Sequence, residues 1–259
     1  MARIGIFDSG VGGLTVQRAI IDRLPALDTV YLGDKARLPY GTKSPEVVTQ
    51  YSLRAAAFLA EQDIDLLVVA CNTASSVALP ALRRAHAIPV LGVVEPGARA
   101  AARASRSGRI GVIGTQATVE SGSYQAALRG LRPEVEVTAR ACPLFVPLAE
   151  EGWTDPEDEV VRLVARRYLA GLQAASVDTV VLGCTHYPLL SGAIAGALPG
   201  VALVDSAAAI AAEVAERLGS APGAPGTHRF YFTDVPGRFL HVAERFLGLP
   251  IATAEQVDI

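Results

Sequence analysis

Two of the three cysteines occupy matching positions in this chain. Cys71 ends the run 65–71 (DLLVVAC) and Cys184 ends the run 178–184 (DTVVLGC), so each run is an Asp, five small or apolar residues and a Cys. Short β-branched runs of this kind are typical of buried strands, so each thiol is expected at a strand's carboxyl end, where open parallel sheets bind ligands. Two thiols at equivalent points of two half-molecules predict one substrate held between two opposed acid/base groups.

The segments that precede these cysteines also repeat. Residues 3–9 align without a gap with residues 109–115, at an offset of 109 − 3 = 106, against 184 − 71 = 113 for the cysteines. A third and weaker pair is formed by residues 89–95 and 200–205. Three matched strands in the same order predict an internal duplication of a βαβ-type half, and a period this long fits two domains and no solenoid.

The expected strands alternate with helical segments, the pattern of an α/β fold with mostly parallel sheets. We expect two pseudo-symmetric domains with helices flanking each sheet and the active site in the cleft between them. The first domain would comprise residues 1–95 plus 210–259, and the second residues 96–209. The strands are expected near residues 3–7, 29–33, 65–70, 90–94, 109–113, 135–139, 178–183 and 201–204.

The clearest predicted helix covers residues 157–174. Thr154-x-x-Glu157 has the pattern of a capping box at its start. Its apolar face would contain Val160, Val161, Val164, Tyr168 and Leu172.

The end of the chain has no counterpart in the repeat. Residues 219–227, rich in glycine and proline, are expected to form a surface linker. Beyond the linker, residues 229–234 predict a strand and residues 237–246 a helix, and we expect both to pack on the first half.

The composition excludes several classes of protein. Of the 259 residues 51% are hydrophobic, yet no apolar run approaches the ~20 residues of a membrane span. The net charge of −3 and the spread of the arginines along the chain give no nucleic-acid footprint. Three cysteines cannot all pair, and the first residues lack the pattern of a signal peptide, so we expect a cytoplasmic protein.

The glycine-rich segment 8–15 (DSGVGGLT) follows the first expected strand. A dinucleotide site is disfavoured there, because Thr15 stands where the last glycine of G-x-G-x-x-G belongs and Asp8 would repel a pyrophosphate. The glycines favour a turn into a helix. The carboxylate and the hydroxyl at this strand end could bind an ammonium group.

Two further segments place polar groups at the same sheet edge. In the loop 34–41 (DKARLPYG), Tyr40 and the amide of Gly41 are expected to face a ligand, although a plain surface loop has the same composition. Cys71 begins a helix, whose free N–H groups favour an anion, so Asn72 and Thr73 suit a substrate carboxylate.

The segment 184–188 (CTHYP) is the strongest local signal. A lone cysteine is usually an inert core residue, but the duplication of Cys71 at Cys184 argues against that interpretation here. His186 could stabilise a thiolate or relay its proton, unless it is a structural histidine. One of the acids that end residues 142–151 could hold His186, whereas Cys142 itself lacks a partner in the repeat and is interpreted as structural.

Cofactor chemistry finds no support in the sequence. Lys35 and Lys43 are the only lysines and both lie in a loop, so a pyridoxal Schiff base has no convincing candidate. Neither H-E-x-x-H, nor paired C-x-x-C, nor a P-loop sequence occurs, and we expect neither a metal nor a cofactor.

Taken together, five segments resemble the bacterial glutamate racemases of the aspartate/glutamate racemase superfamily. They are residues 7–16 (FDSGVGGLTV), 36–41 (ARLPYG), 71–75 (CNTAS), 142–147 (CPLFVP) and 182–190 (LGCTHYPLL). The resemblance runs from residue 4 to about residue 206, without departure at a motif position. It implies a cofactor-independent enzyme that interconverts L- and D-glutamate and supplies D-glutamate for peptidoglycan.

The resemblance also implies roles for individual residues. Cys71 would serve the D-enantiomer and Cys184 the L-enantiomer, with Asp8, His186 and Glu150, rather than Glu151, assisting proton transfer. Substrate contacts would come from Asp8, Ser9, Tyr40, Gly41, Asn72, Thr73, Thr115, Thr118, Thr185 and His186.

The physical chemistry of the two thiols fits these roles. A free thiol has a pKa of about 8.5, so the site must help to form a thiolate at neutral pH. His186 could favour the thiolate of Cys184, while Asp8 should raise the pKa of Cys71 by like charge, which makes positioning and proton relay its better description. We expect the two halves to close over glutamate, because the carbanion must form with little water present.

Other functions stay open at this point. Aspartate racemase, hydantoin racemase and maleate isomerase share the two-cysteine design, and a direct assay with each substrate separates them. A binding role, such as the inhibition of DNA gyrase reported for some members of the family, finds no support in the acidic composition. We expect a homodimer with glutamate as its substrate and with neither a membrane nor a nucleic acid as a partner.

Overall fold

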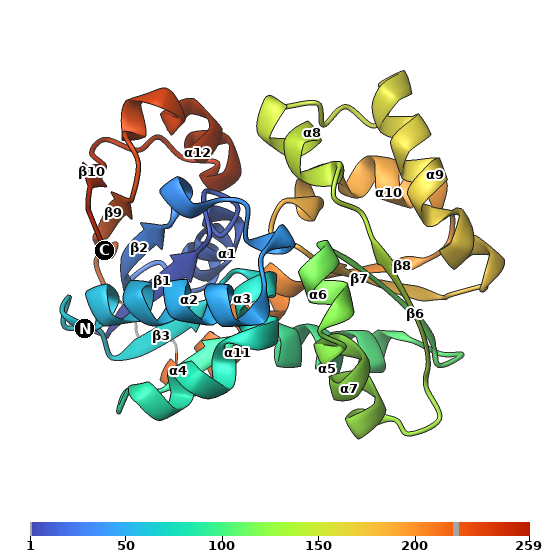
Figure 1. The fold of residues 1–259 in the computed structure, drawn as a ribbon, viewed down its shortest axis with the longest axis horizontal. Coiled ribbons are helices and arrows are strands. Elements are labelled where there is room, and N and C mark those ends of the chain that lie inside the picture. The colour runs from blue at the N-terminus through green and yellow to red at the C-terminus, as the bar shows by residue number, and fades with distance from the viewer. Residues whose placement is uncertain (1, 220–222) are drawn as a thin grey trace.

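A computed structural model describes residues 2–219 and 223–259. Two parallel β-sheets lie next to each other, each between layers of helices (Figure 1). The first sheet has the strand order β10-β9-β2-β1-β3-β4. Its strands are β1 (Arg3–Asp8), β2 (Asp28–Gly33), β3 (Leu66–Val69), β4 (Val90–Gly92), β9 (His228–Phe232) and β10 (Glu255–Gln256).

The second sheet repeats the central part of the first. Its order is β6-β5-β7-β8, which matches β2-β1-β3-β4 strand for strand. Its strands are β5 (Arg109–Gly114), β6 (Glu136–Ala141), β7 (Thr179–Gly183) and β8 (Ala202–Asp205). The predicted α/β fold with two duplicated, parallel sheets is confirmed.

The strand register carries the offsets found in the sequence. Ile4 pairs with Leu66 in the first sheet, and Ile110 pairs with Thr179 in the second. The differences are 110 − 4 = 106 and 179 − 66 = 113, the two values given by the aligned segments. The third predicted pair needs a correction of two residues. Leu67 pairs with Val90 and Val180 with Leu203, which makes 203 − 90 = 113 the structural offset, whereas residues 89 and 200 differ by 111.

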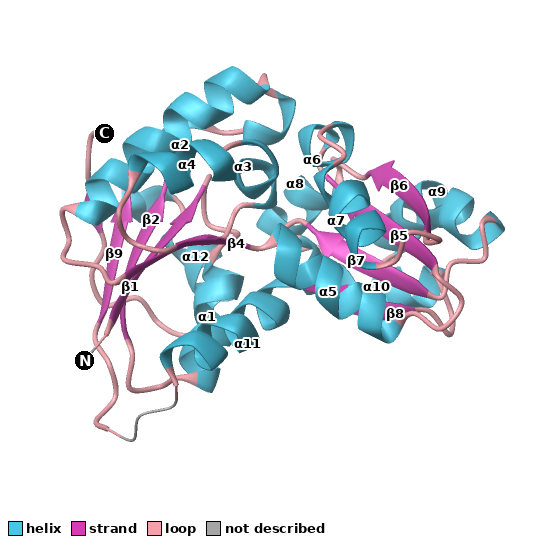
Figure 2. Ribbon diagram, turned by 90° about the horizontal axis from the view of Figure 1, so that it is seen from below, coloured by secondary structure: helices cyan, strands magenta, loops and turns pink. Residues whose placement is uncertain are grey.

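Helices cover both faces of the first sheet (Figure 2). On one face the apolar side chains pack with α1 (Leu14–Arg23), α11 (Ser206–Leu218) and α12 (Leu240–Leu247). On the other face lie α2 (Pro45–Ala60), α3 (Asn72–Val77) and α4 (Leu79–Ala85). The short 3-10 helices η1 (Lys35–Arg37) and η2 (Tyr40–Thr42) follow β2, and η4 (Pro236–Arg238) precedes α12.

The second sheet is covered in the same manner. One face packs with α5 (Val94–Ala104) and α7 (Ser123–Leu131), and the other with α8 (Phe145–Glu151), α9 (Glu159–Ala174) and α10 (Ser191–Ala197). The helix α6 (Gln116–Glu120) contacts η2 and α3 of the first half, and η3 (Tyr187–Leu190) follows β7. One apolar cluster continues through both halves, and α11 packs on both α1 and α5, so the two sheets share part of their core.

Helix α9 begins two residues later than predicted, and the expected capping box is wrong. The N-cap is Asp158, whose carboxylate accepts hydrogen bonds from the backbone N–H groups of Val160 and Val161 at 2.8 and 3.0 Å. A carboxylate at the N-cap is strongly preferred, and Asp158 therefore sets the first turn in place of Thr154. Val160 is 47% exposed and does not belong to the buried face.

The end of the chain completes the first sheet. The predicted tail strand forms as β9 and pairs with β2, and the predicted tail helix forms as α12, three residues later than expected because η4 precedes it. Part of the predicted linker, residues 220–222, lies outside the described residues. None of the helices in the described ranges is long and apolar enough to cross a membrane. The predicted domain boundaries stay predictions.

Candidate active site

A cavity of about 270 Å³ lies between the two halves, at the carboxyl ends of their equivalent strands. Ser9 follows β1, Cys71 comes two residues after β3, Thr115 follows β5 and Cys184 follows β7. This volume is slightly below the range typical of drug-sized ligands and suits a small metabolite. Ten predicted site residues line the cavity: Ser9, Tyr40, Gly41, Cys71, Asn72, Thr73, Thr115, Cys184, Thr185 and His186.

Cys71 is the N-cap of α3. Its Sγ atom accepts a hydrogen bond from the amide of Ala74 at 3.4 Å and lies 3.5 Å from the hydroxyl of Ser9. Burial and the nearby charge of Asp8 raise the pKa of the Cys71 thiol to about 12. The like-charge effect expected from the sequence is therefore present, but desolvation is the larger cause.

Asp8 lies beneath the cavity and does not line it. It ends β1, is 1% exposed, and its Oδ2 atom accepts a hydrogen bond from the amide of Gly10 at 2.8 Å. Its Oδ1 atom is buried without a hydrogen-bond partner in the described chain. Burial raises the pKa of the Asp8 carboxyl, although the charge of His186 and the Gly10 amide oppose this shift. A carboxyl with a raised pKa can hold a proton near Cys71.

The second thiol belongs to a chain of polar contacts. The Sγ atom of Cys184 lies 3.7 Å from Nδ1 of His186, and Nε2 of His186 lies 3.1 Å from Oε1 of Glu150. The ring of His186 also meets the ring of Phe246 of α12 edge to face, at 5.0 Å between centroids. A carboxylate on the far nitrogen orients an imidazole and stabilises its protonated form.

The electrostatics of this chain favour a charged pair. Burial lowers the pKa of His186, but its hydrogen bonds to Cys184 and Glu150 and their charges outweigh burial and raise the pKa to about 10. Burial raises the pKa of Glu150, but His186 and Lys35 outweigh it and lower the pKa to about 2. At neutral pH these values correspond to an imidazolium paired with a carboxylate.

The second part of the loop 34–41, residues 38–41, lines the cavity, whereas residues 34–37 do not. Tyr40 is buried and its hydroxyl donates a hydrogen bond to Oδ2 of Asp34 at 2.6 Å, so the phenol is held by the protein. Burial and the adjacent Asp34 raise the pKa of Tyr40 above its ordinary value, so the hydroxyl stays protonated. Asp34 is itself fully buried and also pairs with Arg37 at 2.8 Å. Sequence reasoning left the anchoring role of Asp34 unassigned.

Polar side chains join the two halves beside Cys71. The hydroxyl of Thr73 lies 2.9 Å from that of Thr115 and 3.3 Å from that of Thr118. The amide oxygen of Asn72 accepts a hydrogen bond from the hydroxyl of Tyr124 at 2.6 Å. Thr118 is fully buried behind Thr115 and does not line the cavity, so its direct contact with a substrate stays a prediction.

Gly12 allows the two halves to approach closely. A Cβ atom at Gly12 would lie 2.3 Å from Oγ1 of Thr185 and 2.5 Å from Cε1 of His186, distances that real Cβ atoms essentially never show. The neighbouring Thr15 donates a hydrogen bond to the carbonyl of Thr185 at 3.1 Å. The glycine turn after β1 therefore supports the second-half residues His186 and Thr185 directly.

Cys142 and Glu150 lie outside the cavity lining, which also contains residues that the sequence did not indicate. Cys142 is fully buried and does not line the cavity, and burial raises the pKa of its thiol to about 12. Glu150 contacts His186 from outside the cavity lining. Sequence reasoning did not assign seven lining residues, although several lie within the quoted motifs: Leu38, Pro39, Thr42, Gln116, Pro143, Val146 and Pro147.

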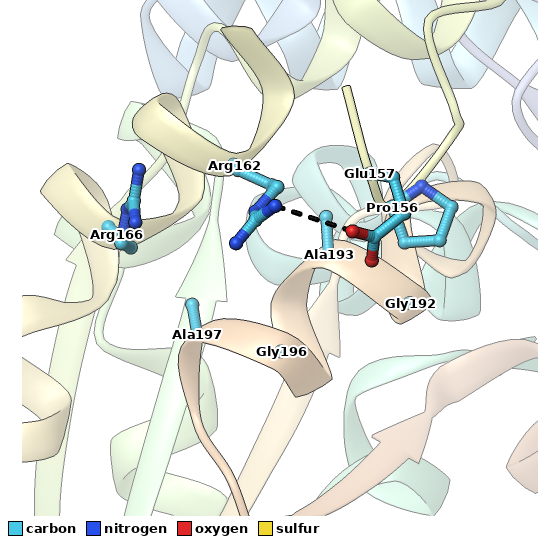
Figure 3. A pocket seen from close by; sticks show the side chains of 8 residues that line it. All are labelled: Pro156, Glu157, Arg162, Arg166, Gly192, Ala193, Gly196 and Ala197. Carbon is cyan, nitrogen blue, oxygen red and sulfur yellow. Dashed lines mark hydrogen bonds and ion pairs between the residues drawn. The ribbon is translucent and has the colours of Figure 1, made fainter. Parts of the chain in front are cut away.

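A second, smaller hollow of about 150 Å³ lies between α9 and α10 (Figure 3). Arg162 pairs with Glu157 at 3.3 Å on the α9 side of this hollow, and Pro156 packs where Gly192 has no side chain. It contains neither a thiol nor a histidine. In the described ranges, no three side chains among His, Cys, Asp and Glu are grouped to ligate a metal ion.

Comparison with known proteins agrees with this geometry. The sequence profile of the Asp/Glu/Hydantoin racemase family matches residues 9–214. The glutamate racemase of Geobacter metallireducens is 57% identical over 99% of this chain and 96% of its own length.

Solved structures give the same result. The glutamate racemase isoform of Bacillus anthracis superposes with a TM-score of 0.94 at 40% identity, over 100% of this chain and 98% of that one. The glutamate racemase of Francisella tularensis, solved with D-glutamate, gives 0.92 at 35% identity, over 99% and 97%. The resemblance seen in the sequence is confirmed, and the chain belongs to the Asp/Glu/Hydantoin racemase family.

Proposed function

We propose that this protein interconverts L- and D-glutamate by a two-base mechanism in which Cys71 and Cys184 are the paired acid and base. The observation that carries the proposal is that both thiols line one cavity, from equivalent strand ends of two duplicated sheets. The names of the full-length relatives support glutamate as the substrate.

The thiols would act on opposite faces of the α-carbon. From L-glutamate, the thiolate of Cys184 removes the α-proton and the thiol of Cys71 delivers a proton to the other face. From D-glutamate the two exchange roles. In each turnover one sulfur gains a proton and the other loses one. One cysteine must therefore begin as a thiolate and the other as a thiol.

Three groups would assist these transfers. His186, held by Glu150 at 3.1 Å, favours the thiolate of Cys184 because an imidazolium stabilises an adjacent anion. Asp8, buried beside Cys71, is suited to pass protons to that sulfur. None of these three groups would require a bound cofactor for its role.

The polar groups around the thiols would bind the substrate's charges. Thr73, Thr115 and Thr185 offer hydroxyls to the cavity, and Asn72 and Thr73, which also line it, begin α3 after the N-cap Cys71. Helix N-termini and hydroxyls suit the carboxylates of glutamate. The loop residues Tyr40 and Gly41 would close the cavity from the first half.

Deuterium labelling tests the two-base mechanism. In deuterated water, dialysed protein without added cofactor should convert L-glutamate to early D-glutamate that carries deuterium, while the remaining L-glutamate stays almost unlabelled. Replacing Cys71→Ser or Cys184→Ser should abolish racemisation in both directions, because a hydroxyl is a far weaker acid than a thiol. Label that appears equally in both enantiomers, or near-normal turnover of either variant, would remove the paired roles of these cysteines.

The proposed role in the cell follows from the product. D-glutamate made in this way would supply peptidoglycan synthesis, and this would place the enzyme in the cytoplasm. A homodimeric assembly stays a prediction, which light scattering of the purified protein would test.

A further inference from the structure

We propose that Lys35 is a positioning residue for one of the two proton transfers. From the first half of the molecule it holds Glu150 against His186, and through His186 it supports Cys184 and not Cys71. This inference rests on the proposed racemase function and adds to it a residue that acts on one face of the substrate only.

The backbone around Lys35 is fixed on both sides. Asp34 is fully buried and accepts hydrogen bonds from Arg37, Tyr40 and Thr233. The amide of Ala36 donates to the hydroxyl of Thr233 at 3.0 Å. Lys35 therefore extends from a rigid base across the boundary between the halves.

The ammonium group of Lys35 joins the polar chain behind Cys184. Its Nζ atom lies 3.2 Å from Oε2 of Glu150, while the other carboxylate oxygen, Oε1, contacts Nε2 of His186 at 3.1 Å. Nδ1 of His186 then faces Sγ of Cys184 at 3.7 Å. With both oxygens of Glu150 engaged, the carboxylate cannot rotate without breaking one of the two contacts.

Other groups hold this arrangement in place. The side chains of Lys35 and Glu150 are only 20% and 26% exposed, so water screens their pair incompletely. The ring of Phe239 lies 5.7 Å from Nζ of Lys35, and Arg245 donates to the backbone carbonyl of Glu150 at 3.1 Å. The tail of the chain thus supports both partners.

The support is one-sided. Cys71 has the hydroxyl of Ser9 and the amide of Ala74 as its hydrogen-bond partners, and neither carries a charge. Its charged neighbour is the buried Asp8. The charges of His186 and Glu150 also act on Asp8, but neither residue is a hydrogen-bond partner of Cys71. A change at Lys35 should therefore reach the L-face transfer by Cys184 far more strongly than the D-face transfer by Cys71.

Values of kcat/KM alone cannot show which of the two proton transfers a variant slows. Two enantiomers have equal free energy in water, so the racemisation equilibrium constant is unity and kcat/KM must be equal in both directions for every variant. Kinetic isotope effects need not be equal in the two directions, because the sulfur that removes the α-deuteron differs between L- and D-glutamate.

The experiment compares Lys35→Met with the wild type on α-deuterated L- and D-glutamate. Loss of an ion pair of this exposure should lower kcat/KM about five-fold. Slower abstraction by Cys184 should increase the isotope effect on kcat/KM from L-glutamate. It should decrease the isotope effect from D-glutamate, because the carbanion then returns more often to Cys71 before Cys184 can protonate it.

Three variants separate positioning from a purely structural effect. Lys43→Met, which removes the only other lysine and breaks no ion pair among the described residues, should keep wild-type rates and isotope effects. Lys35→Arg should restore most of the activity. In a Glu150→Gln background, Lys35→Met should have less than half of its effect on log kcat/KM, because Lys35 acts through Glu150.

A measurement without turnover keeps this inference separate from the proposed function. Lys35→Met should slow iodoacetamide labelling of Cys184 several-fold at neutral pH and leave Cys71 unchanged, as read by mass spectrometry of each peptide. A wild-type protein that fails to racemise glutamate would overturn the proposed function, and the labelling would then decide the role of Lys35. Unchanged labelling of Cys184, or isotope effects that change equally for both enantiomers, would overturn the role of Lys35.

Discussion

Replacing Gly12 by alanine tests whether the glycine turn of the first half supports the proton-transfer groups of the second. The backbone of Gly12 lies outside the left-handed region, so alanine is sterically allowed at this position in the isolated chain. Its added methyl group would nevertheless lie 2.3 Å from Oγ1 of Thr185 and 2.5 Å from Cε1 of His186. The perturbation therefore acts on neighbours across the cleft.

The structure gives the size of the expected displacement. Ordinary van der Waals contact begins at 3.4 Å, so the His186 ring must move by about 3.4 − 2.5 = 0.9 Å and the Thr185 hydroxyl by about 3.4 − 2.3 = 1.1 Å. A misplacement of about 1 Å in a catalytic group can lower the rate roughly 100-fold. Overpacking of this kind should also reduce the free energy of unfolding by about 1–3 kcal/mol.

The assay is the rate of racemisation of L- and D-glutamate, with thermal unfolding measured in parallel. Gly171→Ala in α9 is the matched control, because a Cβ atom there meets no atom within 4 Å. That variant should keep wild-type kcat and gain roughly 0.5–1 kcal/mol of helix stability. A folded Gly12→Ala protein with wild-type kcat would refute the reasoning, since it would show that the halves separate without disturbing His186.

Two further predictions concern the thiols and the His186–Glu150 pair. Glutamate should protect Cys71 and Cys184, but not the buried Cys142, from an alkylating agent, and equal labelling of all three with and without ligand would contradict their assignment. The stabilisation that His186 contributes should be complete below its ordinary pKa of 6.5 and be lost as pH rises through about 10, because folding raises its pKa. Folding lowers the pKa of Glu150 from 4.5 to about 2, so its contribution should be present above 4.5 and be lost as pH falls toward 2. Urea unfolding of the wild type and His186→Asn should therefore differ most between these ordinary values, and a pH-independent difference would argue against the charged pair.

The duplicated sheets could be predicted from the sequence because their signal is local and repeated. Buried parallel strands are short β-branched runs, and the same runs recur at offsets that later appear as strand register. The start of α9 was less accessible to prediction. Thr154 and Asp158 are both acceptable N-caps, and the structure uses Asp158.

The site was predictable where residues follow strand ends and unpredictable where distant side chains meet. Cys71 and Cys184 could be placed from the repeat alone. The contact of Lys35 with Glu150 joins residues 115 positions apart, and that of Asn72 with Tyr124 joins residues 52 apart. Such contacts depend on how the two halves are set against each other, and no local pattern carries that information. The residues alone indicated one of the two acids at positions 150 and 151 as the partner of His186, and only the family resemblance chose Glu150.

The two thiols have unequal surroundings, and in the proposed mechanism these surroundings would set the protonation state from which a turnover starts. Burial and Asp8 raise the pKa of Cys71 to about 12, which keeps it a thiol, while Sγ of Cys184 lies 3.7 Å from Nδ1 of the His186 imidazolium. We infer that the resting site is ready for L-glutamate. In the proposed mechanism, that turnover would leave the proton on Cys184 and the unfavourable thiolate on Cys71, so the site would have to reset before the next L-glutamate reacts. Asp8, with its own pKa raised by burial, is the neighbouring group best able to return a proton to Cys71. This gives the carboxylate beneath the cavity a reason to be buried and only partly hydrogen-bonded.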